Sequence, residues 1–151
     1  MFFIRRVAWV VVWLGCVASL HALEVQYGSL FRVQGIELKD NRPVLPLSRG
    51  QYANVRVLDK ETWEFVRTCK SPCTQTATGE IEVFSLRAAK TRPGMWISEV
   101  AVDKKWLLTF LVFKEGKKFG FITPQPVTIQ DSAWLDKLHR LLQERIESGD
   151  K

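Results

Sequence analysis

The chain has 151 residues, of which 46% are hydrophobic and 25% are charged. This balance excludes an intrinsically disordered chain, because there is enough apolar surface to offset the entropy that is lost on folding, and the length suits one domain. The 22 lysines and arginines exceed the 16 aspartates and glutamates. This mild excess favours contact with anionic surfaces, although ordinary solubility explains it as well.

Residues 1–22 have the pattern of a secretory signal peptide. A pair of arginines gives a positive start, an apolar run occupies residues 7–17, and small residues lie between residues 18 and 22. The run is shorter than the about 20 residues that a membrane-spanning helix needs. We therefore predict an exported protein that is located in the periplasm or cell envelope or is secreted, with residues 23–151 as a single β-rich domain.

Cys16 leaves two other interpretations of this segment open. A bacterial lipoprotein signal ends in a small residue followed by a lipid-modified cysteine, usually with leucine three positions before it. Gly15 supplies the small residue before Cys16, but Trp13 occupies the position of the leucine. Cys16 is therefore a candidate lipidation site whose surroundings match the lipoprotein pattern only in part. Retention of the segment as an uncleaved membrane anchor is the second alternative.

Alternation of apolar and polar residues predicts β-strands along most of the chain. The strands expected before residue 90 are residues 23–27, 30–38, 51–58, 63–69 and 81–86. Gly35 interrupts the second of them and indicates a bulge or bend. The connections are expected to be turns at residues 39–43 and 59–62, an extended edge or loop at residues 44–50, and a polar loop at residues 70–79.

Residues 94–123 predict a three-stranded antiparallel meander. Three apolar runs, rich in β-branched and aromatic residues, are separated by short lysine-containing breaks at residues 103–105 and 115–118. Gly116 can supply the positive φ of a hairpin turn. Both faces of the middle run, which begins at Trp106, are apolar, so we expect this strand to be central and covered on both sides.

Residues 131–147 predict an amphipathic helix. Asp131 or Ser132 can cap its start, and Trp134 and several leucines recur at helical spacing. We expect this apolar stripe to pack on the sheet, and presentation of the stripe to a partner protein is the alternative. The predicted fold class is mainly β, an antiparallel sandwich or open barrel of about eight short strands with one C-terminal amphipathic helix.

Cys69 and Cys73 are predicted to form a disulfide bond that fixes a short loop. Two cysteines this close in an exported chain favour a disulfide. Their C-x-x-x-C spacing differs from the C-x-x-C of redox motifs. A zinc site would need two further ligands, and the neighbouring sequence supplies none.

The sequence contains no motif for catalysis, a cofactor or a metal. Its two histidines, His21 and His139, are far apart, and His21 belongs to the predicted signal segment. No G-x-S-x-G, G-x-x-x-x-G-K-[ST] or G-x-G-x-x-G pattern occurs. We therefore predict a protein that is not an enzyme and uses no cofactor. The alternative is a small exported hydrolase with two catalytic carboxylates, drawn from Asp59, Glu61, Glu64, Glu80, Glu82, Glu99 and Asp103.

Lysines and aromatic residues gather at the two ends of the predicted meander, just after a basic segment with Arg87, Lys90 and Arg92. We predict a surface for an anionic partner from Lys104, Lys105, Lys114, Lys117, Lys118, Trp106 and Phe119. Lysines that protect strand ends against aggregation explain the same pattern.

The predicted function is that of a non-catalytic exported domain that acts through protein–protein or envelope-surface contacts. Because the chain is expected to be exported, we predict no nucleic-acid partner, and contact with a membrane only through a retained N-terminal anchor. A further alternative is a barrel or sandwich that encloses an apolar ligand, in a cavity lined by Trp63, Trp96 and Phe110.

Overall fold

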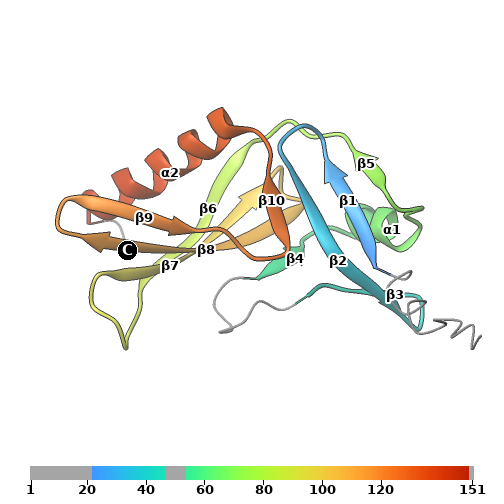
Figure 1. Ribbon diagram of the computed structural model, residues 1–151, viewed down its shortest axis with the longest axis horizontal. Helices are drawn as coiled ribbons and strands as arrows, with labels where there is room; N and C mark the ends of the chain where they lie inside the picture. The colour runs from blue at the N-terminus through green and yellow to red at the C-terminus, as the bar shows by residue number, and fades with distance from the viewer. Residues whose placement is uncertain (1–21, 47–53, 150–151) are drawn as a thin grey trace, which may run out of the picture.

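A computed structural model describes residues 22–46 and 54–149. In these residues the fold is mainly β, as predicted, with ten strands in two open and mostly antiparallel sheets, two more strands than expected. The two sheets lie side by side along the long axis of the molecule (Figure 1). Residues 1–21 of the predicted signal segment, which include Cys16, and residues 51–53 of the strand expected at residues 51–58 lie outside the described residues.

The first sheet has the strand order β10-β2-β1-β5, with β3 paired to the end of β2. Its strands are β1 (Leu23–Tyr27), β2 (Phe31–Lys39), β3 (Arg42–Val44), β5 (Cys73–Gln75) and β10 (Val127–Ile129). The predicted irregularity at Gly35 is confirmed, because Val25 pairs with Val33 whereas Leu23 pairs with Ile36. Gly35 has a φ of 74°, which lets β2 bulge and keep its apolar residues on the buried face.

The second sheet has the order β4-β8-β7-β6, and β9 pairs with the far part of β8. Its strands are β4 (Val55–Val57), β6 (Ile81–Ala88), β7 (Met95–Val102), β8 (Trp106–Glu115) and β9 (Lys118–Ile122). The last three form the predicted meander. Asp103 and Lys104 turn β7 into β8 with φ values of 53° and 56°, as a type I′ turn requires. Gly116, with a φ of 61°, opens the turn into β9.

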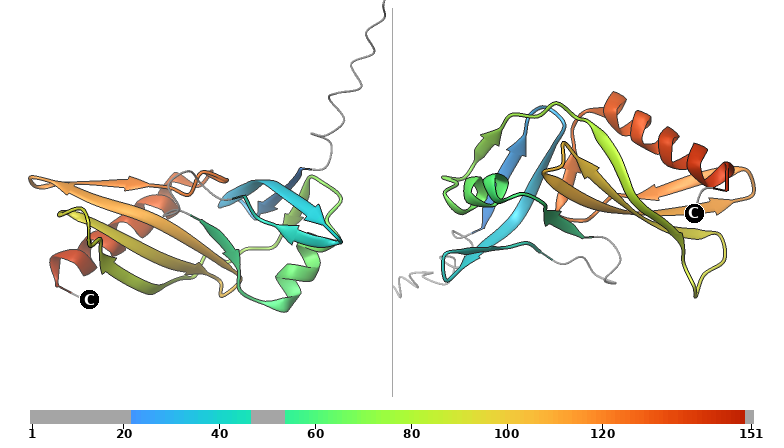
Figure 2. Two further views of the ribbon diagram at one scale, coloured as in Figure 1. Left: turned by 90° about the horizontal axis from the view of Figure 1, so that it is seen from below. Right: turned by 180° about the vertical axis from the view of Figure 1, so that it is seen from behind.

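One face of the second sheet, called the inner face below, is covered by α2 (Ser132–Glu147) (Figures 1 and 2). Asp131 caps this helix by accepting the N–H of Trp134 at 3.0 Å. Trp134, Leu138 and Leu142 are buried in one core cluster with β7 and β8. The predicted packing of the apolar stripe on the sheet is therefore confirmed.

Residues 59–69, predicted as a turn and a strand, contain instead a second helix, α1 (Lys60–Arg67). Asp59 caps this helix by accepting the N–H of Thr62 at 3.0 Å. Thr62 and Val66, which are one helical turn apart, are both buried. The alternating aromatic and polar residues of this segment also suit a strand, but the cap and the burial of positions four apart favour the helix. The expectation of one helix was wrong on this point.

Three short strands, β3, β5 and β10, were not expected from the sequence. Each has three residues, which is too short to show a periodic pattern. The strand β5 lies in the segment predicted as a polar loop and is held by parallel pairing with β1. Pairing with other strands therefore determines these three strands, and local alternation does not. The pairing is long-range for β5 and β10, whereas β3 pairs with the preceding strand β2 across a short turn.

Candidate functional site

The turn between β7 and β8 carries a carboxylate that binds a neighbouring loop. Asp103 accepts hydrogen bonds from the Tyr27 hydroxyl at 2.5 Å and from the N–H groups of Thr78, Gly79 and Glu80 at 2.9, 2.9 and 2.6 Å. The Thr78 hydroxyl donates a fifth bond. Burial alone would raise the pKa of Asp103, but these hydrogen bonds outweigh burial and hold that pKa well below its usual range.

A pocket of about 320 Å³ lies beside this carboxylate. It is lined by Tyr27, Thr76, Thr78, Glu80, Asp103, Lys104 and Lys105, and it therefore contains two of the carboxylates considered for hydrolysis. The five donors occupy the lone pairs of Asp103, and its low pKa prevents it from acting as a general acid near neutral pH. Asp103 therefore cannot supply the general acid of the carboxylate pair that glycoside cleavage needs.

The other candidate carboxylates have structural partners or are exposed. Asp59 caps α1, Glu64 forms an ion pair within that helix, and Glu99 accepts a hydrogen bond from β6. Glu61 and Glu82 are exposed. Among the described residues, no group of three or more His, Cys, Asp or Glu side chains is arranged to hold a metal ion.

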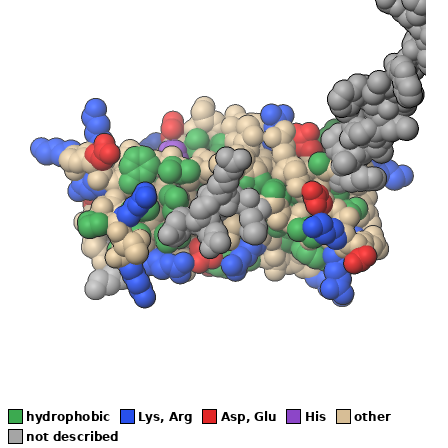
Figure 3. All heavy atoms as spheres, turned by 60° about the horizontal axis from the view of Figure 1, so that its bottom comes forward, with side chains coloured by type: hydrophobic (Ala, Val, Ile, Leu, Met, Phe, Trp, Pro, Cys, Tyr) green, Lys and Arg blue, Asp and Glu red, His purple; other side chains and the backbone are tan. Residues whose placement is uncertain are grey.

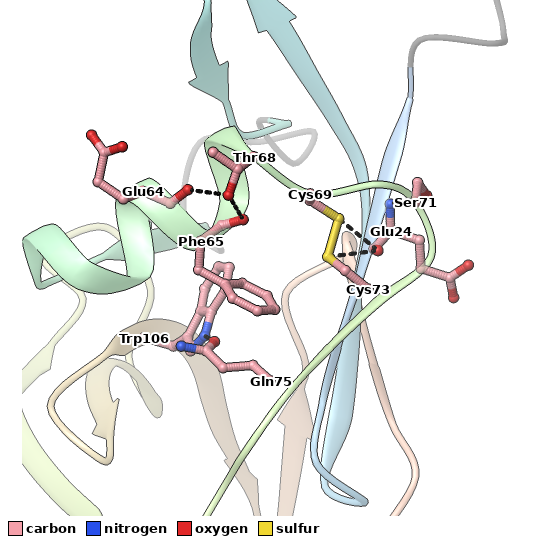
Figure 4. The surroundings of a disulfide bond; sticks show 9 residues. All are labelled: Glu24, Glu64, Phe65, Thr68, Cys69, Ser71, Cys73, Gln75 and Trp106. Carbon is pink, nitrogen blue, oxygen red and sulfur yellow. Dashed lines mark hydrogen bonds between the residues drawn. A yellow bond between two sulfur atoms is a disulfide. The ribbon is translucent and has the colours of Figure 1, made fainter.

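Cys69 and Cys73 form the predicted disulfide bond, with their Cα atoms 5.7 Å apart (Figure 4). Cys69 follows α1 and Cys73 begins β5. Both sulfur atoms lie 3.7 Å from the carbonyl oxygen of Glu24 in β1, and the Ser71 hydroxyl accepts the N–H of Glu24 at 2.9 Å. The disulfide loop is thus packed on β1, where it fixes the connection from α1 to β5.

A buried polar chain next to this loop joins both sheets to α1. Figure 4 shows two of its members, Gln75 and Trp106. Gln75 in β5 accepts the indole N–H of Trp106 at 3.1 Å and donates to the Thr62 hydroxyl at 3.2 Å. Trp106 and Thr62 are fully buried. Trp106, which the sequence placed with a surface for an anionic partner, therefore lies in the core.

The lysines of that predicted surface lie in two separate groups. Lys104 and Lys105 lie at the β7–β8 turn, whereas Lys114, Lys117 and Lys118 lie at the β8–β9 hairpin. The two groups are at opposite ends of β8, a strand of ten residues that spans about 33 Å at the usual rise. Phe119 lies with the second group, because Lys114 Nζ is 5.4 Å from the centroid of its ring.

The face of the second sheet away from α2, called the outer face, carries a group of apolar side chains. Pairing aligns Ile97, Leu111 and Ile122 in one row across β7, β8 and β9, and places Met95 beside Phe113 in the next row. Ile122 is 43% exposed and the other four are partly exposed. We call these five residues the outer apolar patch. In Figure 3, hydrophobic and basic side chains lie together toward the end that holds the β8–β9 hairpin.

This patch changes the expectation that β8 is covered on both sides. On the outer face, Leu107 and Thr109 are buried, but Leu111 and Phe113 keep part of their surface exposed. The expectation therefore holds for the first half of the strand and was wrong for the second half. The residues of an apolar strand face follow the same sequence pattern whether other parts of the protein cover that face or leave it exposed. The sequence therefore does not distinguish a covered face from an exposed one.

His139 has a packing role. Its ring stacks on Phe121 of β9, with the ring centroids 3.9 Å apart, and joins α2 to the inner face. Its Nε2 atom is buried without a hydrogen-bond partner among the described residues. Burial lowers the pKa of His139, and the charge of Asp136 opposes this shift.

No family model, curated protein or solved structure matches the chain. In the part of the chain that the structure describes, no helix combines the length and apolar character needed to cross a membrane. Function is therefore inferred from the surfaces and side chains of this chain itself.

Proposed function

We propose that this chain is a non-catalytic exported domain that binds a partner protein through the outer apolar patch. One observation carries the proposal: five apolar side chains from three adjacent strands share one sheet face, and all five keep exposed surface. Single exposed apolar residues are normal on protein surfaces, whereas a contiguous group of them is typical of an interaction site.

The surroundings of the patch support a protein interface. Arg87 of β6 pairs with Ile97. It therefore adds a charged residue to the end of the apolar row, at the edge of the sheet. Glu99 and Thr109 form the next pair along the strands toward the β7–β8 turn. An apolar centre with a polar rim is the usual anatomy of such interfaces.

The placement of the other candidate residues supports a non-catalytic role. Asp103 has all its lone pairs engaged, so the carboxylate hydrolase gains no support from the pocket beside it. Phe110 is fully buried, and Trp96 packs on Phe119 with 6.5 Å between the ring centroids. These aromatic residues contact the protein itself, which disfavours an enclosed apolar ligand. Export is supported by the signal-like pattern of residues 1–22 and by the disulfide.

Affinity capture from the native envelope, followed by mass spectrometry, tests this proposal with two matched variants. Ile122 and Val44 are β-branched residues with similar exposure, 43% and 39%, but Val44 lies in the first sheet. We expect Ile122→Arg to reduce recovery of a stoichiometric partner at least about tenfold, as loss of an interface centre does, and Val44→Arg to leave it unchanged. Equal recovery with both folded variants, or hydrolysis of an envelope polymer by the pure protein, would overturn the proposal.

A further inference from the structure

The end of the second sheet that holds the β6–β7 and β8–β9 connections is strongly basic. The Lys114 N–H donates to the carbonyl of Gly94 at 2.9 Å, and Met95 pairs with Phe113, so the two connections lie side by side (Figure 1). Six exposed cations extend from them and from the adjoining strand ends. These residues, called the basic end, are Arg87, Lys90, Arg92, Lys114, Lys117 and Lys118.

The positive charge of the basic end has little compensation among the described residues. Glu115 is the carboxylate within the β8–β9 hairpin, and the stretch of α2 at this end, residues 140–147, holds two arginines and two glutamates, which cancel. The ion pairs that the described residues form lie elsewhere, in the first sheet and in α1. The basic end is therefore available to bind an anionic partner.

We propose that the basic end docks this domain on anionic lipid headgroups at a membrane surface, a contact that differs from the sequence-based prediction of membrane contact only through a retained N-terminal anchor. Its cations are spread over two hairpin connections, and four of the six are lysines. Lysines are flexible point charges that suit a diffuse array of phosphates, whereas arginines are preferred for a single bidentate ligand. A cluster of four to eight basic side chains binds an anionic membrane with about 1 kcal/mol from each cation near the surface.

The composition of the two connections favours lipid over a protein partner for the connections themselves, which adjoin Met95 and Phe113 of the outer apolar patch. Residues 89–94 and 115–118 contain no leucine, isoleucine, phenylalanine or tryptophan. They therefore lack the apolar anchors that form the centre of a protein interface and the side chains that would enter the acyl region. Binding is electrostatic, reversible and sensitive to salt. It needs no partner on the outer apolar patch, so it stands independently of the proposed function.

Vesicle co-sedimentation with the purified full chain tests this inference. The variant Lys90→Gln/Lys117→Gln/Lys118→Gln removes half of the basic end. The control Arg42→Gln/Lys60→Gln/Lys70→Gln removes the same charge from exposed positions on β3, on α1 and after α1. We expect preferential binding to phosphatidylglycerol-containing vesicles over pure phosphatidylcholine. The first variant should lose roughly 100-fold in affinity for the anionic vesicles, and the control about twofold or less.

The readout is the ratio of the affinities for anionic and neutral vesicles, because the apolar N-terminal segment can bind both kinds equally if it is retained. Equal affinity for the two kinds of vesicle would overturn the inference, and so would equal losses in the two triple variants. Binding to soluble polyglutamate as tight as binding to the anionic vesicles would assign the basic end to acidic polypeptides instead.

Discussion

The hydroxyl of Tyr27 donates a hydrogen bond to the carboxylate of Asp103 at 2.5 Å and thereby joins the first sheet to the β7–β8 turn of the second. Tyr27 is fully buried, and its ring lies 5.0 Å from Phe31 and 6.5 Å from Trp106 between centroids. The ring thus contributes to the core between the sheets, while the hydroxyl reaches a charged acceptor. A buried tyrosine hydroxyl usually has such a partner.

Tyr27→Phe keeps the ring and removes this bond. We expect the free energy of unfolding to fall by about 1.5–3 kcal/mol, the usual contribution of a hydrogen bond to a charged group, in urea titrations followed by tryptophan fluorescence. Ser85→Ala is the control, because it removes a hydroxyl that donates to Glu99 at 2.9 Å at a less buried position. Equal losses in the free energy of unfolding would show that the hydrogen bond between the sheets contributes no more to stability than the less buried one at Ser85.

Acid should destabilise the protein through Asp103. The pKa of Asp103 is lower in the folded state than its ordinary value of about 3.9, so the unfolded chain takes up the proton first and acid favours unfolding. This stabilisation is complete above about pH 4 and is lost progressively as the pH falls toward the folded-state pKa.

The variant Asp103→Asn isolates this contribution. It should lower stability at pH 7 and flatten the dependence of stability on pH below about pH 4, measured by thermal unfolding at a series of pH values. Glu82→Gln removes an exposed carboxylate, and its stability should depend on pH in the same way as that of the native protein. If the stability of Asp103→Asn falls with decreasing pH as steeply as that of the native protein, other carboxylates determine the loss of stability in acid.

The meander, α2 and the disulfide could be predicted from sequence because each depends on local chemistry. Runs of apolar residues separated by short turns specify hairpins, and the stripe that contains Trp134 and Leu138 specifies a helix. The helix α1 was missed because its eight residues form only two helical turns. Over so short a segment, the apolar positions of a helix can also be read as the alternation of a strand. Its signal was Asp59, a cap residue three positions before Thr62.

The interactions around the candidate sites could not be predicted in the same way. The partners of Asp103 come from β1 and from residues 78–80. Residues 78–80 approach it because β6 pairs with β7, whereas β1 belongs to the other sheet and approaches it through packing in the core. The basic end combines two connections that are adjacent because β7 pairs with β8. Sequence reasoning grouped the lysines by their order along the chain, which joined Lys104 and Lys105 to a surface at the other end of β8.

Loss of the disulfide should have a modest effect. The bond closes a loop of five residues from Cys69 to Cys73, for which the entropy of loop closure gives about 2 kcal/mol. We expect Cys69→Ala/Cys73→Ala to lower the free energy of unfolding by that amount in urea, and reductant to lower the stability of the native protein but not of the variant. Unchanged stability in the double variant would show that packing on Glu24 holds this loop without the bond.

Gln75→Leu should destabilise the protein by about 3 kcal/mol, because it leaves a buried donor, the Trp106 indole N–H, and a buried acceptor, the Thr62 hydroxyl oxygen, without their partner. A double-mutant cycle with Thr62→Val, measured by urea unfolding, separates this effect from packing. Thr62→Val alone leaves the Gln75 amide unpaired, whereas the double variant replaces both polar groups with apolar ones. The double variant should therefore lose about 0.5–3 kcal/mol less stability than the sum of the losses in the two single variants. Additive losses would mean that the side chains of Gln75 and Thr62 act independently, and that Trp106 alone links β5 to the second sheet.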